Sequence, residues 1–254
     1  MLKTRVIPCL LLRNFGLVKT IRFKDPKYLG DPINIVRIFN EKAVDELMFL
    51  DIAATVENRR PSFQLLEKIA SECFTPFSYG GGIRNLEDMK ILFKIGVEKV
   101  VVNSYTVENP TFVRSAADLF GSQSVVVSVD VKRNQWGKYE VFTHSGQKAT
   151  GLDPVKYARD MEEQGPGELL LTSIDLDGTM AGYDLELIKR VSSAVSIPVV
   201  ACGGAGSLEH LRQAVKQGGA SAVAAGSLFV FHGPHRAVLI NYPTLEELQK
   251  ALGE

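Results

Sequence analysis

The sequence repeats itself at close to half its length. Residues 81–87 (GGIRNLE) and 203–209 (GGAGSLE) share a double glycine followed by a leucine and a glutamate, and the two stretches begin 122 positions apart. Glu46-Leu47 and Glu168-Leu169 are separated by the same offset. Each double glycine follows an expected strand and opens an expected helix. A duplicated unit of this kind predicts two four-stranded halves that close one eight-stranded barrel.

Short apolar segments alternate with amphipathic helical segments along the whole chain. Continuous apolar runs suit strands that are buried on both faces of a parallel sheet. An open doubly wound sheet also alternates strands and helices, but it gives no reason for two equivalent glycine turns half a chain apart. We therefore predict an α/β fold, a single (β/α)8 TIM barrel over residues 1–254 with half-barrels at about 1–122 and 123–240. The expected strands are 5–12, 46–50, 76–79, 100–103, 125–130, 168–172, 198–201 and 222–225, and clear helices are 86–93 and 184–195.

Composition excludes several classes of partner. Lys and Arg together equal Asp and Glu together, at 29 each, so the chain has no overall field to attract nucleic acid or an anionic membrane. No apolar stretch reaches the roughly 18 residues that span a bilayer. The three cysteines, Cys9, Cys73 and Cys202, lack metal-site spacing and are expected to be reduced core thiols. We expect a cytoplasmic protein without metal, cofactor, nucleic-acid partner or membrane partner.

Glycines and small polar residues stand at the ends of the expected strands, where a βα barrel builds its active site. Glycine lets the backbone approach an anion, and the amino terminus of a following helix adds favourable partial charge. We predict one phosphate site in each half, and hence a bis-phosphate or nucleotide-type ligand. The predicted phosphate-binding residues are Gly81, Gly82, Asn103 and Ser104 in the first half and Asp177, Gly178, Gly203, Gly204, Gly226 and Ser227 in the second.

Asp130 is the predicted acid–base residue. It ends a valine-rich strand, where an unpaired carboxylate of purely structural origin would be costly. The alternative is a helix cap or a partner for Lys132 or Arg133. Asp51 follows another strand, and for this residue a site role and a structural role are equally open. The four histidines lack metal-site spacing and are expected in loops or at the surface.

Four charged residues stand at or just before the start of expected strands. They should therefore gather at the amino-terminal mouth of the barrel, opposite the predicted active site. Two bases and two acids can form a closed ring of ion pairs there. Taken alone, such a ring indicates a stabilising plug. The four residues are Arg5, Glu46, Lys99 and Glu168.

Motifs spread over about residues 1–231 resemble the cyclase subunit of imidazole glycerol phosphate synthase, a barrel of histidine biosynthesis. Together they are highly specific. The resemblance is carried by Arg5…Ile7-Pro8-Cys9-Leu10, Gly30-Asp31-Pro32, Asp45-Glu46-Leu47…Phe49-Leu50-Asp51-Ile52, Gly80-Gly81-Gly82-Ile83, Val107-Glu108-Asn109-Pro110, Phe120-Gly121-Ser122-Gln123, Leu171-Thr172-Ser173-Ile174-Asp175, Asp177-Gly178-Thr179 and Gly203-Gly204-Ala205-Gly206.

The resemblance implies a lyase that forms a heterodimer with a glutaminase subunit. In this family, ammonia from the glutaminase passes along the barrel axis to a ribonucleotide with a phosphate at each end, and two aspartates assist ring closure and elimination. The resemblance also implies that Arg5, Glu46, Lys99 and Glu168 form the ammonia gate at the glutaminase interface. Lys19, on a long mobile loop after the first strand, would help to close over the substrate.

One expected aspartate is missing. The second of the family's pair corresponds to Asp130, but the first corresponds to position 11, where this chain has leucine. A positioned acid–base group contributes about 10²–10⁴-fold to a rate, and Leu11 cannot transfer a proton. The turn at residues 12–16 and the tail from residue 231 also depart from the family pattern.

This combination resembles a paralogue group that works with a glutaminase in surface-polysaccharide pathways, including lipopolysaccharide O-antigen synthesis. Such proteins supply ammonia to a third, ATP-dependent enzyme that turns an acetamido group on a nucleotide sugar into an acetamidino group. The first hypothesis is therefore an ammonia-conducting barrel of a glutamine amidotransferase. One alternative is a genuine imidazole glycerol phosphate synthase cyclase, in which another residue replaces the lost acid. The other is a non-enzymatic scaffold that binds a phosphate ligand and the glutaminase.

Overall fold

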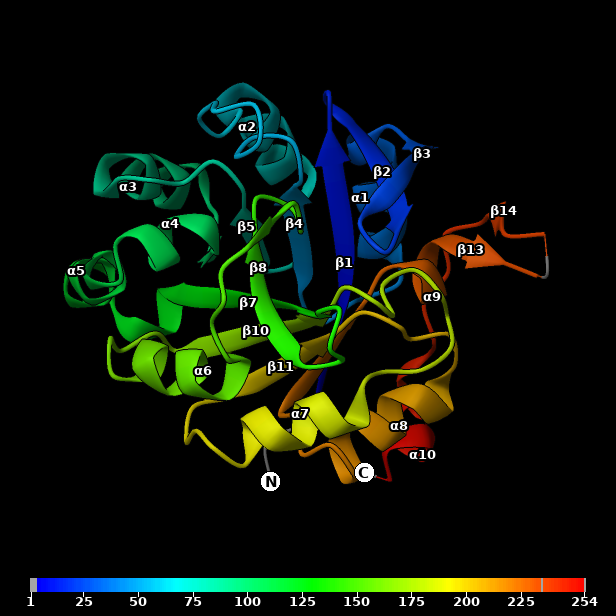
Figure 1. Ribbon diagram of the computed structural model, residues 1–254. Helices are drawn as coiled ribbons and strands as arrows, with labels where there is room; N and C mark the ends of the chain where they lie inside the picture. Colours follow the sequence, from blue (N-terminus) through cyan, green and yellow to red (C-terminus); the bar gives the residue numbers. More distant parts are fainter. Residues whose placement is uncertain (1–3, 234, 254) are drawn as a thin grey trace.

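Eight parallel strands close into a barrel in the computed structural model, which describes residues 4–233 and 235–253 (Figure 1). The order around the barrel follows the chain, and pairing of the fifth barrel strand with the sixth and of the last with the first closes it. The predicted TIM barrel is confirmed; its predicted ends, Met1 and Glu254, lie outside the described residues. The barrel strands are β1 (Arg5–Arg13), β4 (Leu47–Asp51), β5 (Phe77–Gly80), β6 (Lys99–Val102), β7 (Val125–Arg133), β10 (Glu168–Ser173), β11 (Val199–Cys202) and β12 (Ala222–Ala225).

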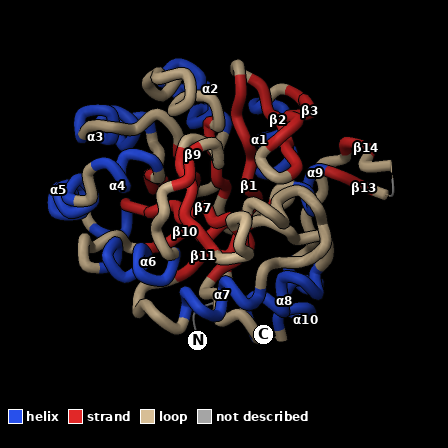
Figure 2. The backbone as a smooth tube through the Cα atoms, viewed as in Figure 1, coloured by secondary structure: helices blue, strands red, loops and turns tan. Residues whose placement is uncertain are grey.

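Helices form the outer ring around the strands (Figure 2). Several begin at residues that cap the helix; Asp31, for example, accepts hydrogen bonds from the N–H groups of Ile33 and Asn34. No helix in the described part of the chain is long and apolar enough to cross a membrane. The helices are α1 (Pro32–Glu41), α2 (Phe63–Glu72), α3 (Leu86–Ile95), α4 (Ser104–Glu108), α5 (Thr111–Phe120), α6 (Pro154–Glu162), α7 (Leu185–Ser192), α8 (Leu208–Lys216), α9 (Ser227–Val230) and α10 (Leu245–Leu252), with a 3₁₀ turn at Ser122–Ser124.

The internal repeat of the sequence is also a repeat of structure. Strands β5 and β11 begin at residues 77 and 199, and helices α3 and α8 begin at residues 86 and 208, so both pairs keep the 122-residue offset. In both double-glycine turns each glycine has positive φ: +122° and +73° at Gly81 and Gly82, and +88° and +115° at Gly203 and Gly204. Equivalent elements of the two halves therefore occupy equivalent places in the barrel.

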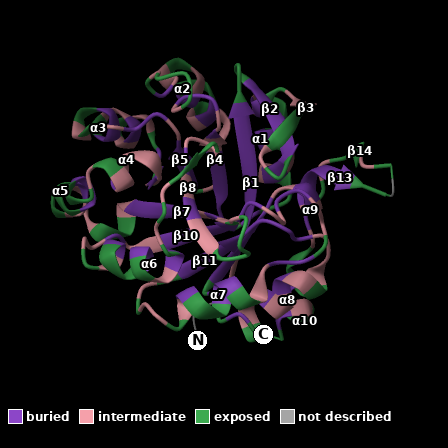
Figure 3. Ribbon diagram, in the orientation of Figure 1, coloured by how far each residue is buried: buried purple, intermediate pink, exposed green. Residues whose placement is uncertain are grey.

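The core has two parts because side chains alternate along each strand. On β1, Ile7, Cys9 and Leu11 belong to the cluster inside the barrel, whereas Val6 and Leu10 belong to the larger cluster between strands and helices. Figure 3 shows the buried strands at the centre and exposed residues on the outer helices. Burial on both faces accounts for the continuous apolar runs of the sequence.

Antiparallel hairpins extend the chain at the carboxyl-terminal end of the barrel strands. Strand β2 pairs with β1, β8 pairs with β7, and a small separate hairpin follows α9. These additional strands are β2 (Gly16–Ile21), β3 (Lys24–Gly30), β8 (Tyr139–Thr143), β9 (Lys148–Ala149), β13 (Phe231–His232) and β14 (Ala237–Val238).

The prediction of a loop after the first strand was wrong, because β2 and β3 form a hairpin there. The first five residues of β2 are buried, and its backbone groups pair with β1 on one side and β3 on the other. Lys19, expected on that loop, lies in β2 and is only 6% exposed. A charged residue inside a buried strand breaks the sequence pattern by which a strand is recognised.

Gly204→Ala should destabilise the protein by about 3 kcal/mol. Its φ of +115° is strained for an L-residue, and a Cβ atom there would overlap the carbonyl oxygen of Gly182. Gly137→Ala is the matched control, with φ of +73° and no atom within 4 Å of the added Cβ, and should cost only about 1 kcal/mol. Denaturant unfolding measures both values. Equal losses would contradict the role assigned to close backbone packing.

Candidate functional site

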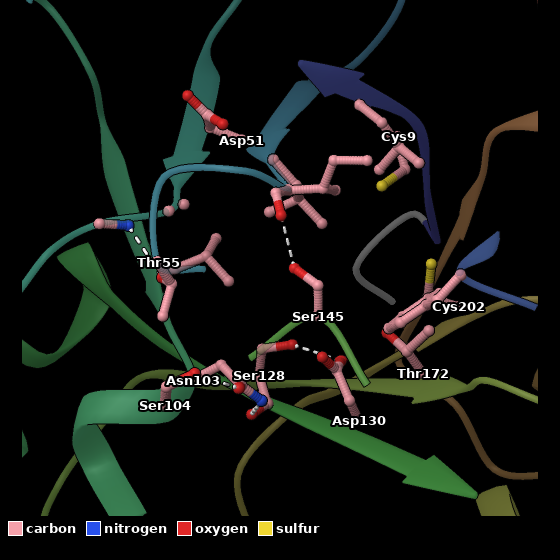
Figure 4. Close-up of a pocket in the computed structure, with 18 of the residues that line it drawn as sticks. Cys9, Asp51, Thr55, Asn103, Ser104, Ser128, Asp130, Ser145, Thr172 and Cys202 are labelled. Atoms are coloured by element: carbon pink, nitrogen blue, oxygen red, sulfur yellow. Dashed lines mark hydrogen bonds between the residues drawn. The ribbon is translucent and has the colours of Figure 1, made fainter. Parts of the chain in front are cut away.

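A cavity of about 130 Å³ lies at the carboxyl-terminal ends of the barrel strands (Figure 4). Strand ends form most of its wall, and Lys19, Thr20 and Phe23 of the β2–β3 hairpin form the rest. Pockets for drug-sized ligands measure about 300–1,000 Å³. The cavity in this arrangement is smaller than that range and is closed on one side by the β2–β3 hairpin.

Asp130 lies at this cavity on the inner face of β7. Its Oδ1 accepts a hydrogen bond from Ser128 Oγ at 3.0 Å, and Figure 4 shows the two side chains pointing toward each other. Burial, together with the negative charge of Asp177, raises the pKa of Asp130 to about 7, even though the hydrogen bonds from Ser128 and Thr172 act to lower it. A carboxyl group with a pKa near neutral can both accept and donate a proton at physiological pH.

Leu11 is 8% exposed and lies on the wall of the same cavity. Its neighbours inside the barrel are apolar or weakly polar, among them Leu50, Cys9 and Cys202. The hydrogen bond with Cys202, followed by burial, raises the pKa of Cys9 well above its usual value, so this thiol stays protonated. Asp130 therefore lies in a cavity with one apolar wall, and the side chain at position 11 offers it no partner for proton transfer.

The four predicted phosphate residues of the first half all line the cavity. The N–H group of Gly82 donates to Thr55 Oγ1 at 3.2 Å, and Ser104 Oγ donates to Asn103 Oδ1 at 3.1 Å. The structure thus brings Gly81, Gly82, Asn103 and Ser104 to one end of the cavity. In this arrangement their polar groups bond to each other and to neighbouring protein groups, and an anion would compete for them.

The predicted phosphate residues of the second half are less accessible from the cavity. Of these residues, Asp177 and Gly226 line the cavity, whereas Gly178, Gly203, Gly204 and Ser227 do not. Strand β2 packs onto the turn of Gly178, where an added Cβ would overlap the carbonyl oxygen of Thr20. The structure therefore does not join the two predicted phosphate sets in one open cavity, and residues of the β2–β3 hairpin pack against Gly178 and Gly226 of the second set.

A buried ion pair holds the hairpin in this position. Lys19 Nζ lies 2.9 Å from Asp177 Oδ1 and 3.0 Å from Oδ2, and Thr20 Oγ1 donates to Asp177 Oδ2 at 3.2 Å. The backbone N–H of Arg22 donates to the carbonyl oxygen of Asp177 at 2.8 Å. Because Asp177 follows strand β10, these contacts connect the first strands of the chain to the second half of the barrel.

Asp51 is a structural anchor. Its Oδ1 accepts from the N–H groups of Ala53 and Ala54, both at 3.0 Å, and its carboxylate forms a two-pronged ion pair with Arg59 at 2.9 and 3.0 Å. These bonds occupy both oxygens of the carboxylate. Of the two interpretations left open by the sequence, the structure favours the structural one.

Arg5, Glu46, Lys99 and Glu168 form a closed ring at the amino-terminal mouth. Arg5 contacts Glu46 at 2.6 Å and Glu168 at 2.5 Å, and Lys99 contacts the same two carboxylates at 3.2 and 3.3 Å. Burial alone would lower the pKa of Arg5, but the charges of Glu168 and Glu46 together raise it. Each cation thus bridges both acids, and charges of opposite sign alternate around the barrel axis.

The sequence analysis missed several polar residues of the site. Ser128 could have been found, because it stands two residues before Asp130 on the same strand and so shares its inward direction. Ser145 could not, since its contact with the Ile52 carbonyl oxygen, at 2.6 Å, joins residues 93 positions apart. Arg236, from the hairpin after α9, is a further missed residue at the second-half turns. The described residues contain no group of three or more His, Cys, Asp or Glu placed to hold a metal ion.

Comparison with known proteins gives consistent matches over the whole barrel. A sequence profile of the family described as "Histidine biosynthesis protein" matches residues 5–234. The provisionally named imidazole glycerol phosphate synthase subunit hisF2 of Pseudomonas aeruginosa is 51% identical over 98% of this chain and 99% of its own length. A provisionally named subunit HisF of the same synthase from Leptospira interrogans is 50% identical over 97% and 98%, and hisF3 of Vibrio vulnificus is 46% identical over 99% and 97%.

Asp130→Asn should stabilise the protein at pH 8 and leave its stability unchanged near pH 4. The carboxyl group has a pKa of about 7 when folded against 3.8 as its ordinary value, so the folded state binds the proton more tightly. The wild type therefore loses stability as the pH rises from about 4 to about 7. The Asp130→Asn variant does not lose stability in this way. Its free energy of unfolding at pH 8 should exceed that of the wild type by at most about 4 kcal/mol.

Denaturant unfolding at pH 4 and pH 8 measures this difference. Glu72→Gln is a control on the surface, where hydrogen bonding to Arg37 lowers the pKa of the carboxyl group, so its replacement should not stabilise the protein at pH 8. A gain from Asp130→Asn that is the same at both pH values would contradict the raised pKa.

Proposed function

The chain belongs to the family of histidine biosynthesis proteins, and on that premise we propose that it is the barrel subunit of a glutamine amidotransferase. In this proposal a glutaminase docks at the amino-terminal mouth as the second subunit of a heterodimer. Ammonia then enters through the ring of Arg5, Glu46, Lys99 and Glu168 and travels along the barrel axis to the cavity beside Asp130. The relatives named as imidazole glycerol phosphate synthase subunits support this assignment.

The ring is the single observation that carries the proposal. A stabilising plug needs no particular relation to the cavity, but these four side chains surround the same axis that ends at Asp130. Each cation bridges two acids, so movement of Lys99 alone would open one side of the ring while Arg5 still holds both glutamates. Such a ring can act as a gate without loss of the barrel.

Leu11 argues for an acceptor reaction that differs from the family's cyclisation. With Leu11 in place of one of the two expected aspartates, the barrel lacks half of the expected acid–base pair. We propose delivery of ammonia for amidination of a nucleotide sugar in surface-polysaccharide biosynthesis, with a third, ATP-dependent enzyme carrying out the final step. The glycine turns predicted to bind phosphate and the apolar wall beside Asp130 are compatible with a phosphorylated ligand that undergoes no cyclisation in this barrel.

The second candidate function is the imidazole glycerol phosphate synthase cyclase reaction itself. Two observations favour it: the names of the relatives and the pKa of about 7 at Asp130. A group with that pKa can serve in turn as base and acid in ring closure. In this case Asp130 carries out both proton transfers, or another residue supplies the second.

Lys99→Ala should uncouple glutamine-dependent from ammonia-dependent product formation. With the glutaminase partner and glutamine, the rate should fall at least about tenfold, equivalent to about 1.4 kcal/mol. The rate with ammonium salt should stay unchanged, because free ammonia reaches the cavity from solvent. Arg37→Ala, which removes an exposed ion pair with Glu72, is the control. If Lys99→Ala lowered the glutamine-dependent and the ammonia-dependent rates equally, the assignment of an ammonia conduit would be contradicted.

A cyclase assay separates the two candidate functions. The purified chain is given the family's bis-phosphate ribonucleotide and excess ammonium salt, with Asp130→Ala as the blank. We expect no turnover by the wild type and measurable turnover by Leu11→Asp, because an acid–base group at this position is worth about 10²–10⁴-fold. Wild-type turnover that Asp130→Ala abolishes would instead establish the histidine-pathway reaction.

A further inference from the structure

The β13–β14 hairpin carries a cation to the second-half glycine turns. In Figure 1 this hairpin projects from the body of the molecule next to α9. Hydrogen bonds from the N–H of Leu239 to the Val230 carbonyl oxygen and from the N–H of Asn241 to the Phe229 carbonyl oxygen, at 3.0 and 2.9 Å, tie it to that helix. Arg236 at the hairpin turn is thereby directed back toward the barrel.

We propose that Arg236 binds a phosphoryl group of the ligand at the turns of Gly178 and Ser227. This inference rests on the proposed function only in that the ligand is phosphorylated. Arg236 Nη2 donates to the Gly178 carbonyl oxygen at 2.9 Å and lies 3.4 Å from Ser227 Oγ. Both turns belong to the set predicted from the sequence to bind phosphate, and nothing in the repeat itself supplies a cation there.

Arg236 keeps donors available for a ligand. Its two hydrogen bonds to the turns use Nη2 alone, and among the described residues no hydrogen bond occupies Nη1 or Nε. A planar guanidinium with one edge held and another edge available can bind phosphate oxygens in the two-pronged geometry that arginine favours. The contact with Ser227 would place a hydroxyl donor beside the same anion.

Among the described residues, Arg236 forms no ion pair with an acid. The ion pairs of the described residues give Lys19 a partner in Asp177, but give none to Arg236 or Lys27. Both cations stack on Phe231, with Lys27 Nζ at 5.5 Å and the Arg236 guanidinium carbon at 4.8 Å from the ring centroid. The ring fixes two positive charges near the second-half turns, which favours an anionic ligand there.

Comparison of the two halves explains why this cation comes from a segment outside the repeated unit. In the first half, the double glycine is followed by Ile83 and Arg84, and Arg84 lines the cavity. In the second half the position equivalent to Arg84 is Gly206, whose N–H donates to His210 Nδ1 at 3.1 Å. The first-half loop thus carries an arginine of its own at the cavity, whereas in the second half Arg236 of the final hairpin reaches the neighbouring turns of Gly178 and Ser227.

The test locates the anion and measures its affinity. Crystals of the full chain are soaked in tungstate, a phosphate analogue whose anomalous scattering marks its position, and inorganic phosphate and pyrophosphate are titrated by calorimetry at low salt. The variants are Arg236→Gln, Arg236→Lys and Arg212→Gln. Arg212 lies on α8 and pairs with Glu209, so its replacement removes the same charge from the same half without touching the turns.

We expect a tungstate peak at Arg236 that disappears in Arg236→Gln and persists in Arg212→Gln. Phosphate affinity at this site should fall about 10- to 100-fold in Arg236→Gln, the factor for a lost hydrogen bond to a charged group, and less in Arg236→Lys, which keeps the charge. If the wild type binds pyrophosphate more tightly than phosphate, the phosphoryl group belongs to a nucleotide diphosphate. If it binds phosphate more tightly, the phosphoryl group belongs to a phosphate monoester.

Unchanged peak and affinity in Arg236→Gln, with thermal unfolding as for the wild type, would overturn the proposal. A wild-type peak at the first-half turn without one at Arg236 would also overturn it, and would leave the first phosphate site standing. Failure of ammonia coupling in Lys99→Ala is a separate result, obtained in a different assay at the opposite end of the barrel. The two proposals can therefore fail independently.

Discussion

The alternation of side chains along strands of a closed parallel barrel determines everything else in this molecule. On β1 the inward residues are, in order, Arg5, Ile7, Cys9 and Leu11. Since strands run in parallel, each presents its first inward residue to the amino-terminal mouth and its last to the cavity. Charges therefore gather in a ring at one end, apolar residues fill the middle, and Asp130 lies at the other end. One geometric rule places the charged ring and the cavity at opposite ends of a single axis.

The same packing sets the electrostatics of the cavity. An apolar middle layer keeps water away from Asp130, and this is why its pKa rises to about 7. A carboxylate at position 11 would add a like charge and turn the site into a coupled pair whose protons leave in two steps. With Leu11, the group titrates without such a partner and its environment stays drier. The substitution thus changes both the number of acids and the behaviour of the one that remains.

Much of this could be predicted from the sequence, because its strongest signals are local or repeated. All eight barrel strands lie within about three residues of their predicted bounds, and the glycine turns follow from one offset. The hairpins could not be predicted, since their burial depends on partners far away. Lys19 illustrates the point: nothing near it in the chain indicates Asp177, its ion-pair partner 158 residues later. Arg236 was not predicted for the same reason. Ser128 could have been predicted, because alternate residues of a strand face the same side.

The regions around the two predicted phosphate turns differ in how much of the chain each one requires. The first-half turn takes its residues from a short stretch, Gly81 to Ser104. The second is assembled from Lys19, Asp177 and Arg236, which come from both ends and the middle of the chain. Contacts between distant residues form late in folding, because the loops that join them must be closed first. During synthesis the proposed first anion site can take shape while half of the barrel is still being made, and the proposed second site must wait for the final hairpin.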